Sequence, residues 1–531
     1  MVQIGFAHRQ APMGRGGMVA SCHPLASVAG LEVLKSGGSV ADAAVAANAV
    51  LAVTQPNYCG AGGDFFCLYY EAASKRVHFL NGAGRSGSRA RLEELARRGV
   101  TRVPLTGAGA VTVPGATRAW QMLLERFGTR PLKTLLEPAI HYATDGFPIS
   151  DIVCQAIRAR AESNDDKEWQ RIFMPGGRVP EPGDRFRQPD LGRTLADLAD
   201  DPSVFYTGWV SRAIALRLST DGFVTAGDLA EHSGEWGDPI STTYRGYTVY
   251  ETPPPTQGLA TLLALNLLEG FDVAALPVHS AEHLHLLIEM VKLAYADRNR
   301  WVADPAQTKL PVDRLLDKEY AARRRRAFDP DKAQAYQAGD LDGDTTGFVV
   351  ADAAGNVLSV IQSLYKSFGS GVVPSETGVV LQNRGAYFNT DPRHPNCFGP
   401  RKRPFHTLQA CVVTRDGAPV AGYATMGGDG QAMFHVQALT NLLDYQMEIQ
   451  EAIERPRFVV GPLDPGDVTD TVRIEGRVPE DVRAALGRRG HRVEAVADWF
   501  ARMGHAQGIT LRDGTLRGGA DPRGDGAAVG F

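Results

Sequence analysis

Residues 343–363 read GDTTGFVVADAAGNVLSVIQS, and they decide how the rest of the sequence is interpreted. Two apolar runs flank a glycine-containing turn, which is the pattern of a β-hairpin. If Asp352 and Asn356 lie opposite each other across the turn, the same register places Thr345 opposite Ser363. On this pattern alone, the simplest interpretation is that the two hydroxyls satisfy backbone groups at the open end of the hairpin.

Helical and strand-like patterns surround the hairpin on both sides. Apolar residues at helical spacing predict helices at 24–35, 40–53, 280–301, 431–445 and 479–488. Runs with strand character occur at 65–70, 76–80, 346–351, 357–364, 378–382 and 409–414. Residues 115–335 are expected to be mostly helical, and the polar stretch 335–344 is expected to be an exposed loop. This mixture favours stacked layers of helices and sheets.

The composition of the 531 residues is that of an ordinary folded protein. Hydrophobic residues make up 44% and charged residues 22%, which argues against a disordered chain. The net charge of −4 excludes a chain built mainly to coat nucleic acid or an anionic membrane. The apolar stretch 40–53 is too short to span a bilayer, and the N-terminal residues lack the apolar core of a secretory signal. A cytoplasmic location is therefore expected.

Motifs for metals and nucleotides are weak in this sequence. The 6 cysteines include no C-x-x-C pair, so neither a zinc site nor a disulfide framework is expected. His283 and His285 are two residues apart in a predicted helix, so their imidazoles point to different sides and chelate poorly. The GAGRSG run at 82–87 has the spacing of a dinucleotide-binding loop, but the following run 100–105 lacks the acidic residue that such a site requires. No metal and no cofactor are expected.

Short runs spread along the whole chain resemble the gamma-glutamyltransferase family of N-terminal-nucleophile hydrolases. They are GMVASCHPLA at 17–26, GAGGDF at 60–65, VPG at 113–115, YETPPP at 250–255, AYADR at 294–298, DPR at 521–523 and GF at 530–531. The resemblance implies an α+β fold, a four-layer αββα sandwich, made as an inactive precursor that cuts itself between Asp344 and Thr345. The large fragment 1–344 and the small fragment 345–531 would remain together as one structural domain, a heterodimer that itself could pair.

The chemistry of such a cut needs the residue types found here. The Thr345 hydroxyl would attack the carbonyl of Asp344, and water would hydrolyse the resulting ester. Cleavage frees the α-amine of Thr345, whose ordinary pKa of roughly 7.7–8.0 suits a general base near neutral pH. One residue then supplies both nucleophile and base, so no catalytic histidine is required.

The resemblance also implies roles for other residues. Ser363 matches the hydroxyl residue that orients the nucleophile, and Gly427 with Gly428 matches the backbone oxyanion hole of the family. Arg85 matches an arginine that pairs with a substrate carboxylate, which a guanidinium binds through two hydrogen bonds. The acidic residue that follows this arginine in the family is Ser86 here.

The substrate side of the predicted site departs from the family. Where members hold the donor α-amino group with Asn, Gln and acidic side chains, this chain has Tyr365, Arg384 and Tyr387, and the usual Ser-Ser pair is His406-Thr407. Arg384 would repel an α-ammonium, and together with Arg85 it would favour a small carboxylate-bearing acyl group. The same departures resemble the oxamate amidohydrolase subgroup, through the runs FGSGVV at 368–373, NRGA at 383–386, PFHTL at 404–408 and MGGDGQ at 426–431.

The prediction from the sequence is therefore a self-cleaving amidohydrolase that acts on a small, oxamate-like substrate through a Thr345 acyl-enzyme. Its substrate is a small molecule, and no nucleic acid or membrane partner is expected. Three alternatives remain open. They are a gamma-glutamyl hydrolase or transferase acting on glutathione-like compounds, a hydrolase of an oxalyl carbon–carbon bond in pyrroline natural-product synthesis, and an uncut binding protein with the same fold.

Overall fold

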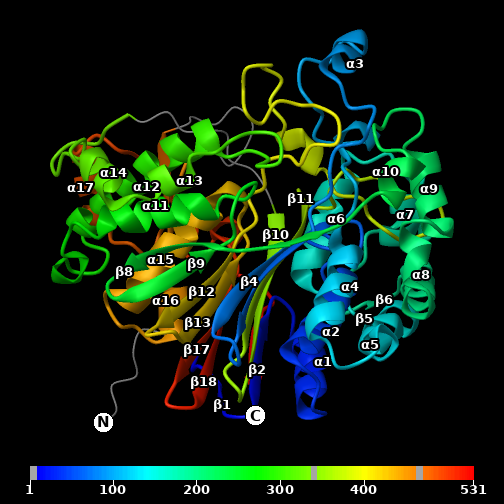
Figure 1. Cartoon of the computed structure of the whole chain (residues 1–531), viewed down its shortest axis with the longest axis horizontal. Coiled ribbons are helices and arrows are strands. Elements are labelled where there is room, and N and C mark those ends of the chain that lie inside the picture. The colour runs from blue at the N-terminus through cyan, green and yellow to red at the C-terminus, as the bar shows by residue number, and fades with distance from the viewer. Residues whose placement is uncertain (1–8, 336–343, 462–469) are drawn as a thin grey trace.

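Two seven-stranded sheets lie face to face at the centre of the molecule (Figure 1). The computed structural model describes residues 9–335, 344–461 and 470–531. The first sheet has the order β19 (Ala527–Gly530), β2 (Gly17–Ser21), β10 (Asp344–Asp352), β11 (Val357–Tyr365), β3 (Asp64–Glu71), β4 (Arg76–Asn81) and β7 (Glu235–Gly237). The second has the order β1 (Met13–Gly14), β18 (Thr515–Ala520), β17 (Ala506–Arg512), β13 (Ala418–Thr425), β12 (Ala410–Arg415), β9 (Tyr247–Glu251) and β8 (Ile240–Tyr244).

The predicted hairpin is β10 with β11, and it lies in the middle of the first sheet. Its side chains alternate between two cores: Val349 and Ala351 pack between the sheets, whereas Phe348 and Val350 pack against the helices outside. Both faces of the strand are buried, which is why its sequence is continuously apolar rather than alternating. The strand order therefore fixes Thr345 deep inside the fold.

Helices cover the outer face of each sheet, and the α+β prediction of a four-layer αββα sandwich is confirmed (Figure 1). The helices on the side of the first sheet are α1 (Pro24–Lys35), α2 (Val40–Thr54), α3 (Leu92–Arg97), α4 (Ala116–Phe127), α5 (Leu132–Asp145), α6 (Asp151–Ala161), α7 (Lys167–Phe173), α8 (Pro189–Asp200), α9 (Trp209–Arg217) and α10 (Ala226–Ala230). Those on the other side are α11 (Gly258–Leu268), α12 (Ala281–Trp301), α13 (Val312–Leu315), α14 (Lys318–Arg325), α15 (Gln431–Leu443), α16 (Ile449–Glu454) and α17 (Glu480–Arg488). Small sheets are β14 (Phe458–Val460), β15 (Thr471–Glu475) and β16 (Arg492–Val496), and β5 (Phe147–Pro148) with β6 (Arg185–Phe186).

Helix α2 packs against the outer face of the hairpin, and the prediction of a helix at 40–53 is confirmed. All of its residues are buried, because its many alanines let it pack closely against α1 and the first sheet. It starts with a capping box in which Ser39 and Asp42 bond each other's backbone N–H groups. Its Asn48 accepts a hydrogen bond from the indole of Trp120 at 2.7 Å. Among the described helices, none is both long and apolar enough to cross a bilayer.

Most predicted elements agree with the structure, with two corrections. The stretch 115–335 is not helical throughout, since the strands β7, β8 and β9 lie within it and complete the edges of both large sheets. The predicted strand at 378–382 is wrong: its backbone bonds to other loops, with Leu381 N donating to Val372 O at 3.0 Å. The segment is apolar because it is buried, and not because it pairs in a ladder. The loop expected at 335–344 falls almost entirely outside the described residues.

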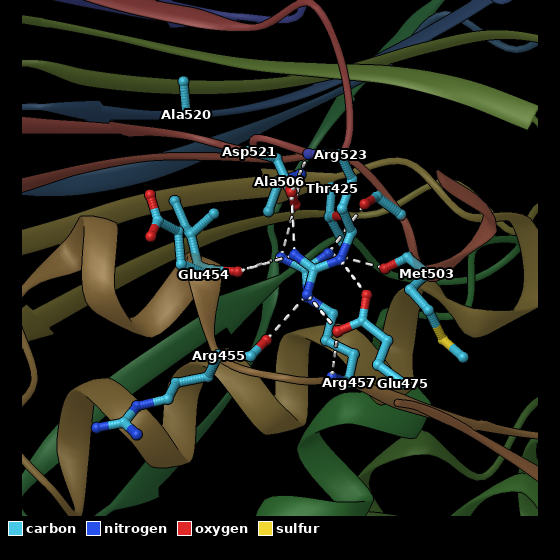
Figure 2. Close-up of polar contacts among 12 residues, drawn as sticks. Thr425, Glu454, Arg455, Arg457, Glu475, Met503, Ala506, Ala520, Asp521 and Arg523 are labelled. Atoms are coloured by element: carbon cyan, nitrogen blue, oxygen red, sulfur yellow. Dashed lines mark hydrogen bonds and ion pairs between the residues drawn. The ribbon is translucent and has the colours of Figure 1, made fainter. Parts of the chain in front are cut away.

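A buried cluster of charged side chains, the Arg457 cluster, ties the last strands to the second helical layer (Figure 2). It consists of Arg457, Glu475, Asp521 and Arg523. The Asp521 carboxylate pairs with Arg457 at 2.7 Å and with Arg523 at 3.0 Å, and Arg523 also pairs with both oxygens of Glu475 at 2.7 Å. Arg457 donates to the carbonyl of Met503 at 2.7 Å. The cluster thus holds the loop that follows Met503.

That loop lies directly against the Gly427 turn. Met426 N donates to His505 O at 3.2 Å, and a Cβ built on Gly504 would lie 2.5 Å from Met426 O. Only glycine fits at position 504, where φ is also +83°. The Arg457 cluster therefore supports the Gly427 turn indirectly, through the loop that follows Met503.

Replacing Asp521 by asparagine is expected to destabilise the fold by about 3–5 kcal/mol near neutral pH, because it leaves two buried guanidinium groups with one carboxylate. Burial alone would raise the pKa of Asp521, but Arg457 and Arg523 outweigh it and lower that pKa to about 2. The unfolded value is higher, so the ionised carboxylate stabilises the fold above about pH 4. The deficit of the variant should shrink as the pH falls toward about 2.

Urea unfolding followed by tryptophan fluorescence measures this deficit. Asp513→Asn is the matched control, because Asp513 is 93% exposed and its nearest cation, Arg512, is 3.7 Å away. The control should unfold at the wild-type urea concentration. Equal midpoints for Asp521→Asn and the wild type would contradict the importance of the cluster.

Candidate active site

The two hydroxyls of the hairpin lie together, as the register predicts. The backbone pairing runs from Thr346 with Gln362 to Ala351 with Val357, and it shifts at a bulge between residues 344 and 346. Thr345 lies at that bulge, and its Oγ1 is 3.3 Å from Ser363 Oγ. Both side chains are buried. A bulge re-aims a side chain at the end of a ladder, and here it aims Thr345 toward the second sheet and α15.

Gln431 is a third residue at the Thr345 hydroxyl, and the sequence did not single it out. It is the first residue of α15, it is fully buried, and its side-chain amide lies 3.1 Å from Thr345 Oγ1. The only sequence signal was its place at the end of the MGGDGQ run. A polar side chain that is fully buried directly after a glycine-rich turn is the pattern that would have found it.

The diglycine turn connects β13 to α15 on the same side as Gln431. Gly427 has φ +127° and Gly428 has φ +54°, and a Cβ on Gly427 would lie 2.5 Å from the ring of Phe434. Neither N–H of this pair donates to an acceptor within the described ranges. Two backbone N–H groups without acceptors, held in a conformation that requires glycine, form the type of site that binds a developing oxyanion.

Arg384 is a fully buried cation with unused donors. It begins the short helix η5 (Arg384–Tyr387), and its Nη1 donates to Thr407 Oγ1 at 3.1 Å. Its Nε and Nη2 have no hydrogen-bond partner in the part of the chain that the structure describes. Burial lowers the pKa of Arg384 from its ordinary value, although a guanidinium remains charged at neutral pH. A buried charge with unpaired donors is costly and is suited to receiving an anion.

Two tyrosines form the wall beside Arg384. Its guanidinium lies 4.6 Å from the centre of the Tyr365 ring and 5.6 Å from that of Tyr387. The Tyr387 hydroxyl donates to Asp429, whose carboxylate also pairs with Arg298 at 2.7 Å. Tyr365 has φ +81°, a left-handed conformation that costs a bulky residue about 1–2 kcal/mol. The surrounding structure holds that strain in the residue on which Arg384 stacks.

His406 faces Asp64, with no ring nitrogen left to contact a substrate. Its Nδ1 lies 2.8 Å from Pro404 O, and its Nε2 lies 3.1 Å from Asp64 Oδ2. A carbonyl only accepts, so Nδ1 carries a hydrogen and the His406–Asp64 pair shares one further proton. Burial lowers the pKa of His406. The other oxygen of Asp64 accepts from Gly84 N at 3.0 Å, so the pair ties the segment before β12 to the glycine-rich loop.

Arg85 lies in a separate ion cluster. Its guanidinium is 2.7 Å from Glu235 and 3.5 Å from Asp304, and Arg403 pairs with the same Glu235 at 2.9 Å. The charges of the two arginines are balanced by the two carboxylates. The positive charge expected for substrate binding is therefore neutralised at Arg85 and remains at Arg384. Among the described residues, no hydrogen bond or ion pair joins Arg85 to Thr345 or Arg384. Sequence reasoning could not find these pairs because their partners are 150 and 219 residues away.

Two buried groups have donor atoms close enough together to hold a metal, but their chemistry argues against it. The groups are His285, Glu289 and His491, and Glu251, Cys411 and His435. In the first, the ammonium of Lys292 lies 2.9 Å from Glu289 and supplies the positive charge. In the second, burial raises the pKa of the Cys411 thiol well above its usual range, which keeps the thiol protonated.

Comparison with known proteins identifies the class. The gamma-glutamyltranspeptidase family model matches residues 26–531, and the chain belongs to that family. It is 41% identical over 524 residues to the glutathione hydrolase-like YwrD proenzyme of Bacillus subtilis, covering 98% of this chain and 99% of that protein. It is 35% identical over 525 residues to the oxamate amidohydrolase proenzyme of Klebsiella pneumoniae, covering 97% and 98%.

A solved structure agrees with the sequence comparisons. Cephalosporin acylase from Bacillus halodurans matches with a TM-score of 0.92 and 35% identity, covering 100% of this chain and 99% of that one. The chain is therefore an enzyme, a hydrolase of the gamma-glutamyltranspeptidase family with the N-terminal-nucleophile hydrolase fold. The resemblance stated from the sequence is confirmed.

Proposed function

We propose that the chain is a precursor that cuts itself between Asp344 and Thr345. Thr345 Oγ1 adds to the carbonyl carbon of residue 344, the C–N bond breaks, and the acyl group moves from nitrogen to oxygen. Water then hydrolyses the ester and leaves a carboxylate on residue 344 and a free α-amine on Thr345. The buried position of Thr345 Oγ1 in a bulge, beside Ser363 and Gln431, supports this role.

The two fragments, 1–344 and 345–531, stay together after such a cut because their strands alternate in both sheets. Strand β10 of the second fragment pairs with β2 of the first, β11 pairs with β3, and β12 pairs with β9. Separating the fragments would break these ladders and expose the core between the sheets. The mature enzyme is thus a heterodimer that forms one structural domain.

The mature site performs acyl transfer with residues of both fragments. Thr345 Oγ1 attacks the amide carbonyl of the substrate, and its proton passes through its own α-amine to the leaving nitrogen. The N–H groups of Gly427 and Gly428 bind the oxyanion, and Ser363 orients the attacking hydroxyl. Water hydrolyses the Thr345 ester by the same steps, so an amide and water give a carboxylate and ammonia. No metal or cofactor takes part.

The substrate is a small amide whose acyl group carries a carboxylate, as in oxamate. The observation that carries this proposal is Arg384, a buried guanidinium with Nε and Nη2 unpaired. Thr407 and the rings of Tyr365 and Tyr387 hold it in place. A carboxylate would pair with both free donors. An α-ammonium about 5 Å away would instead be repelled by about 3 kcal/mol at an effective dielectric constant of about 20. Arg85, with its carboxylate partners, has a supporting role at most in this binding.

A second candidate is a gamma-glutamyl hydrolase or transferase. It is favoured by the 41% identity to the glutathione hydrolase-like proenzyme and by the buried carboxylate of Asp429, beside Tyr387. Arg298 already pairs with Asp429, which weakens its attraction for an α-ammonium. Cleavage of an oxalyl carbon–carbon bond would use the same Arg384 contact as oxamate.

Parallel assays separate the candidates. Purified mature enzyme is expected to release ammonia from oxamate with a kcat/KM at least about a hundredfold above that for a gamma-glutamyl anilide, because about 3 kcal/mol of repulsion corresponds to that ratio. Faster turnover of the anilide would overturn the assignment of Arg384 as a carboxylate site. Full-length uncut protein that binds ligands without turnover would overturn both catalytic candidates.

A further inference from the structure

One of the two orientations of the Gln431 amide satisfies all of its polar neighbours. Its nitrogen donates to Thr407 O at 3.0 Å and to Thr425 O at 3.3 Å, and its oxygen accepts from Thr345 Oγ1 at 3.1 Å. The opposite orientation would set the amide oxygen against two carbonyl oxygens, which offer no hydrogen. Both backbone acceptors are buried: Thr425 is the last residue of β13, and Thr407 lies three residues before β12. The position of Gln431 Oε1 is therefore fixed by these two backbone carbonyls.

This orientation determines where the hydrogen of the nucleophile points. An amide oxygen only accepts, so the Thr345 hydroxyl is the donor in this contact, and Gln431 Oε1 at 3.1 Å and Ser363 Oγ at 3.3 Å are the two acceptors for its single hydrogen. Because Thr345 is the donor in both contacts, neither of them uses a lone pair of Oγ1. Lone pairs are what the attacking oxygen must present to a carbonyl carbon, so the contact holds the hydroxyl in an attacking rotamer.

Gln431 also joins the nucleophile to the anion site and to the diglycine turn. Thr407, whose carbonyl accepts from Gln431, accepts from Arg384 through its hydroxyl. The same Thr407 carbonyl accepts from Gln257 Nε2 at 2.6 Å, and Gln257 Nε2 also donates to Gly428 O at 2.9 Å. One carbonyl thus fixes two buried glutamines, one at the nucleophile and one at the turn.

We propose that Gln431 is a second positioning residue for the Thr345 nucleophile, beside Ser363, an inference that rests on the proposed reaction at Thr345. An amide is not basic, so Gln431 neither gains nor loses a proton during attack. It holds Oγ1 until the hydroxyl proton leaves for the α-amine. Because the amide is neutral, it places no net charge beside the oxygen at any stage. Gln431 does not contact the acyl group, so its removal lowers kcat and leaves KM nearly unchanged.

Gln431→Glu keeps the size of the side chain and removes the donor. The ionised carboxylate faces two carbonyl oxygens, and only its protonated form can donate to one of them. We expect kcat at about pH 8 to fall about a hundredfold, with self-cleavage slowed to a similar extent. The α-amine titrates in both proteins and cancels in their ratio, so the ratio of variant to wild type should fall with rising pH as the introduced carboxyl group, raised in pKa by burial, loses its proton.

Gln437→Glu is a matched control on the same helix. Gln437 Nε2 donates to Met433 O and Phe458 O, both at 3.0 Å, and its oxygen accepts from Phe458 N, so the substitution creates the same conflict away from the hydroxyl. The control should lower the melting temperature as much as Gln431→Glu, yet keep the wild-type kcat and pH profile. Self-cleavage is followed on gels after cell-free synthesis, and turnover by ammonia release from oxamate.

The outcomes separate the two proposals. The role of Gln431 is overturned if the wild type is cut and Gln431→Glu is cut equally fast with the wild-type pH profile. This result leaves the proposed function intact. Wild-type protein that is cut but inactive on oxamate overturns the substrate, while the self-cleavage rates still decide the role of Gln431. Wild-type protein that stays whole and inactive overturns both. A Gln437→Glu defect in kcat equal to that of Gln431→Glu would show that the effect is structural.

Discussion

Thr345→Ala is expected to leave one full-length chain without measurable hydrolysis, a loss of at least about 10⁴-fold in kcat. In the proposed mechanism one side chain supplies the nucleophile for both the cut and the turnover, and the cut supplies the base. Wild-type protein should show fragments of 344 and 187 residues on a denaturing gel, with the sequence TTGFVV at the new N-terminus. The variant should still fold, with a modestly lower melting temperature, because alanine leaves a small cavity and removes the hydroxyl that contacts Ser363 and Gln431.

Thr345→Ser is the control for this prediction. It keeps the hydroxyl and, after cleavage, the amine, and loses only the methyl group, so it should still be cut and active at a reduced rate. Ser363→Ala removes the neighbouring hydroxyl, 3.3 Å away, but not the nucleophile. A second cut site, or a Thr345→Ala protein that still separates into two bands, would contradict the proposal that residue 345 is the nucleophile.

The sequence predicts the hairpin well because its determinants are local. Apolar runs of matched length and one turn fix the register, so the approach of Thr345 to Ser363 follows from the residues between them. Helix α2 is equally predictable, since its cap and its alanines lie within it. The prediction at 378–382 was wrong because burial and strand pairing give the same apolar signal.

Contacts between the layers of the fold could not be predicted from the sequence. Gln431 reaches Thr345 from 86 residues away, and Asp64 reaches His406 from 342 residues away. Such pairs depend on how two sheets and a helix stack, and no local pattern encodes that. Arg384 shows what the sequence can and cannot predict. Its charge could be predicted to matter for the substrate. Only the fold shows that Arg384 is buried with unpaired donors and that Arg85 is neutralised by carboxylates.

Arg384→Met is expected to lower kcat/KM for oxamate by about 10³-fold, since losing one partner of a buried charge pair costs about 2–5 kcal/mol. Self-cleavage should stay within about threefold of the wild type, because the bond after Asp344 needs no anion site. Turnover of a gamma-glutamyl anilide should be unchanged or faster once the repulsion is gone. Lys366→Met is the matched control, because Lys366 is a cation 5.6 Å from the same Tyr365 ring and only half-buried.

The melting temperature of Arg384→Met distinguishes a substrate-binding role of Arg384 from a structural role. Its buried guanidinium leaves Nε and Nη2 unpaired in the free enzyme, a burden that an apolar side chain of similar length would remove. Arg384→Met should therefore melt at or above the wild-type temperature while losing activity, the opposite of the loss expected for a structural ion pair. Oxamate should raise the melting temperature of an inactive Thr345→Ala protein, but not that of Thr345→Ala with Arg384→Met. If Arg384→Met lowers stability and self-cleavage together, the cation holds the fold and the carboxylate must bind elsewhere.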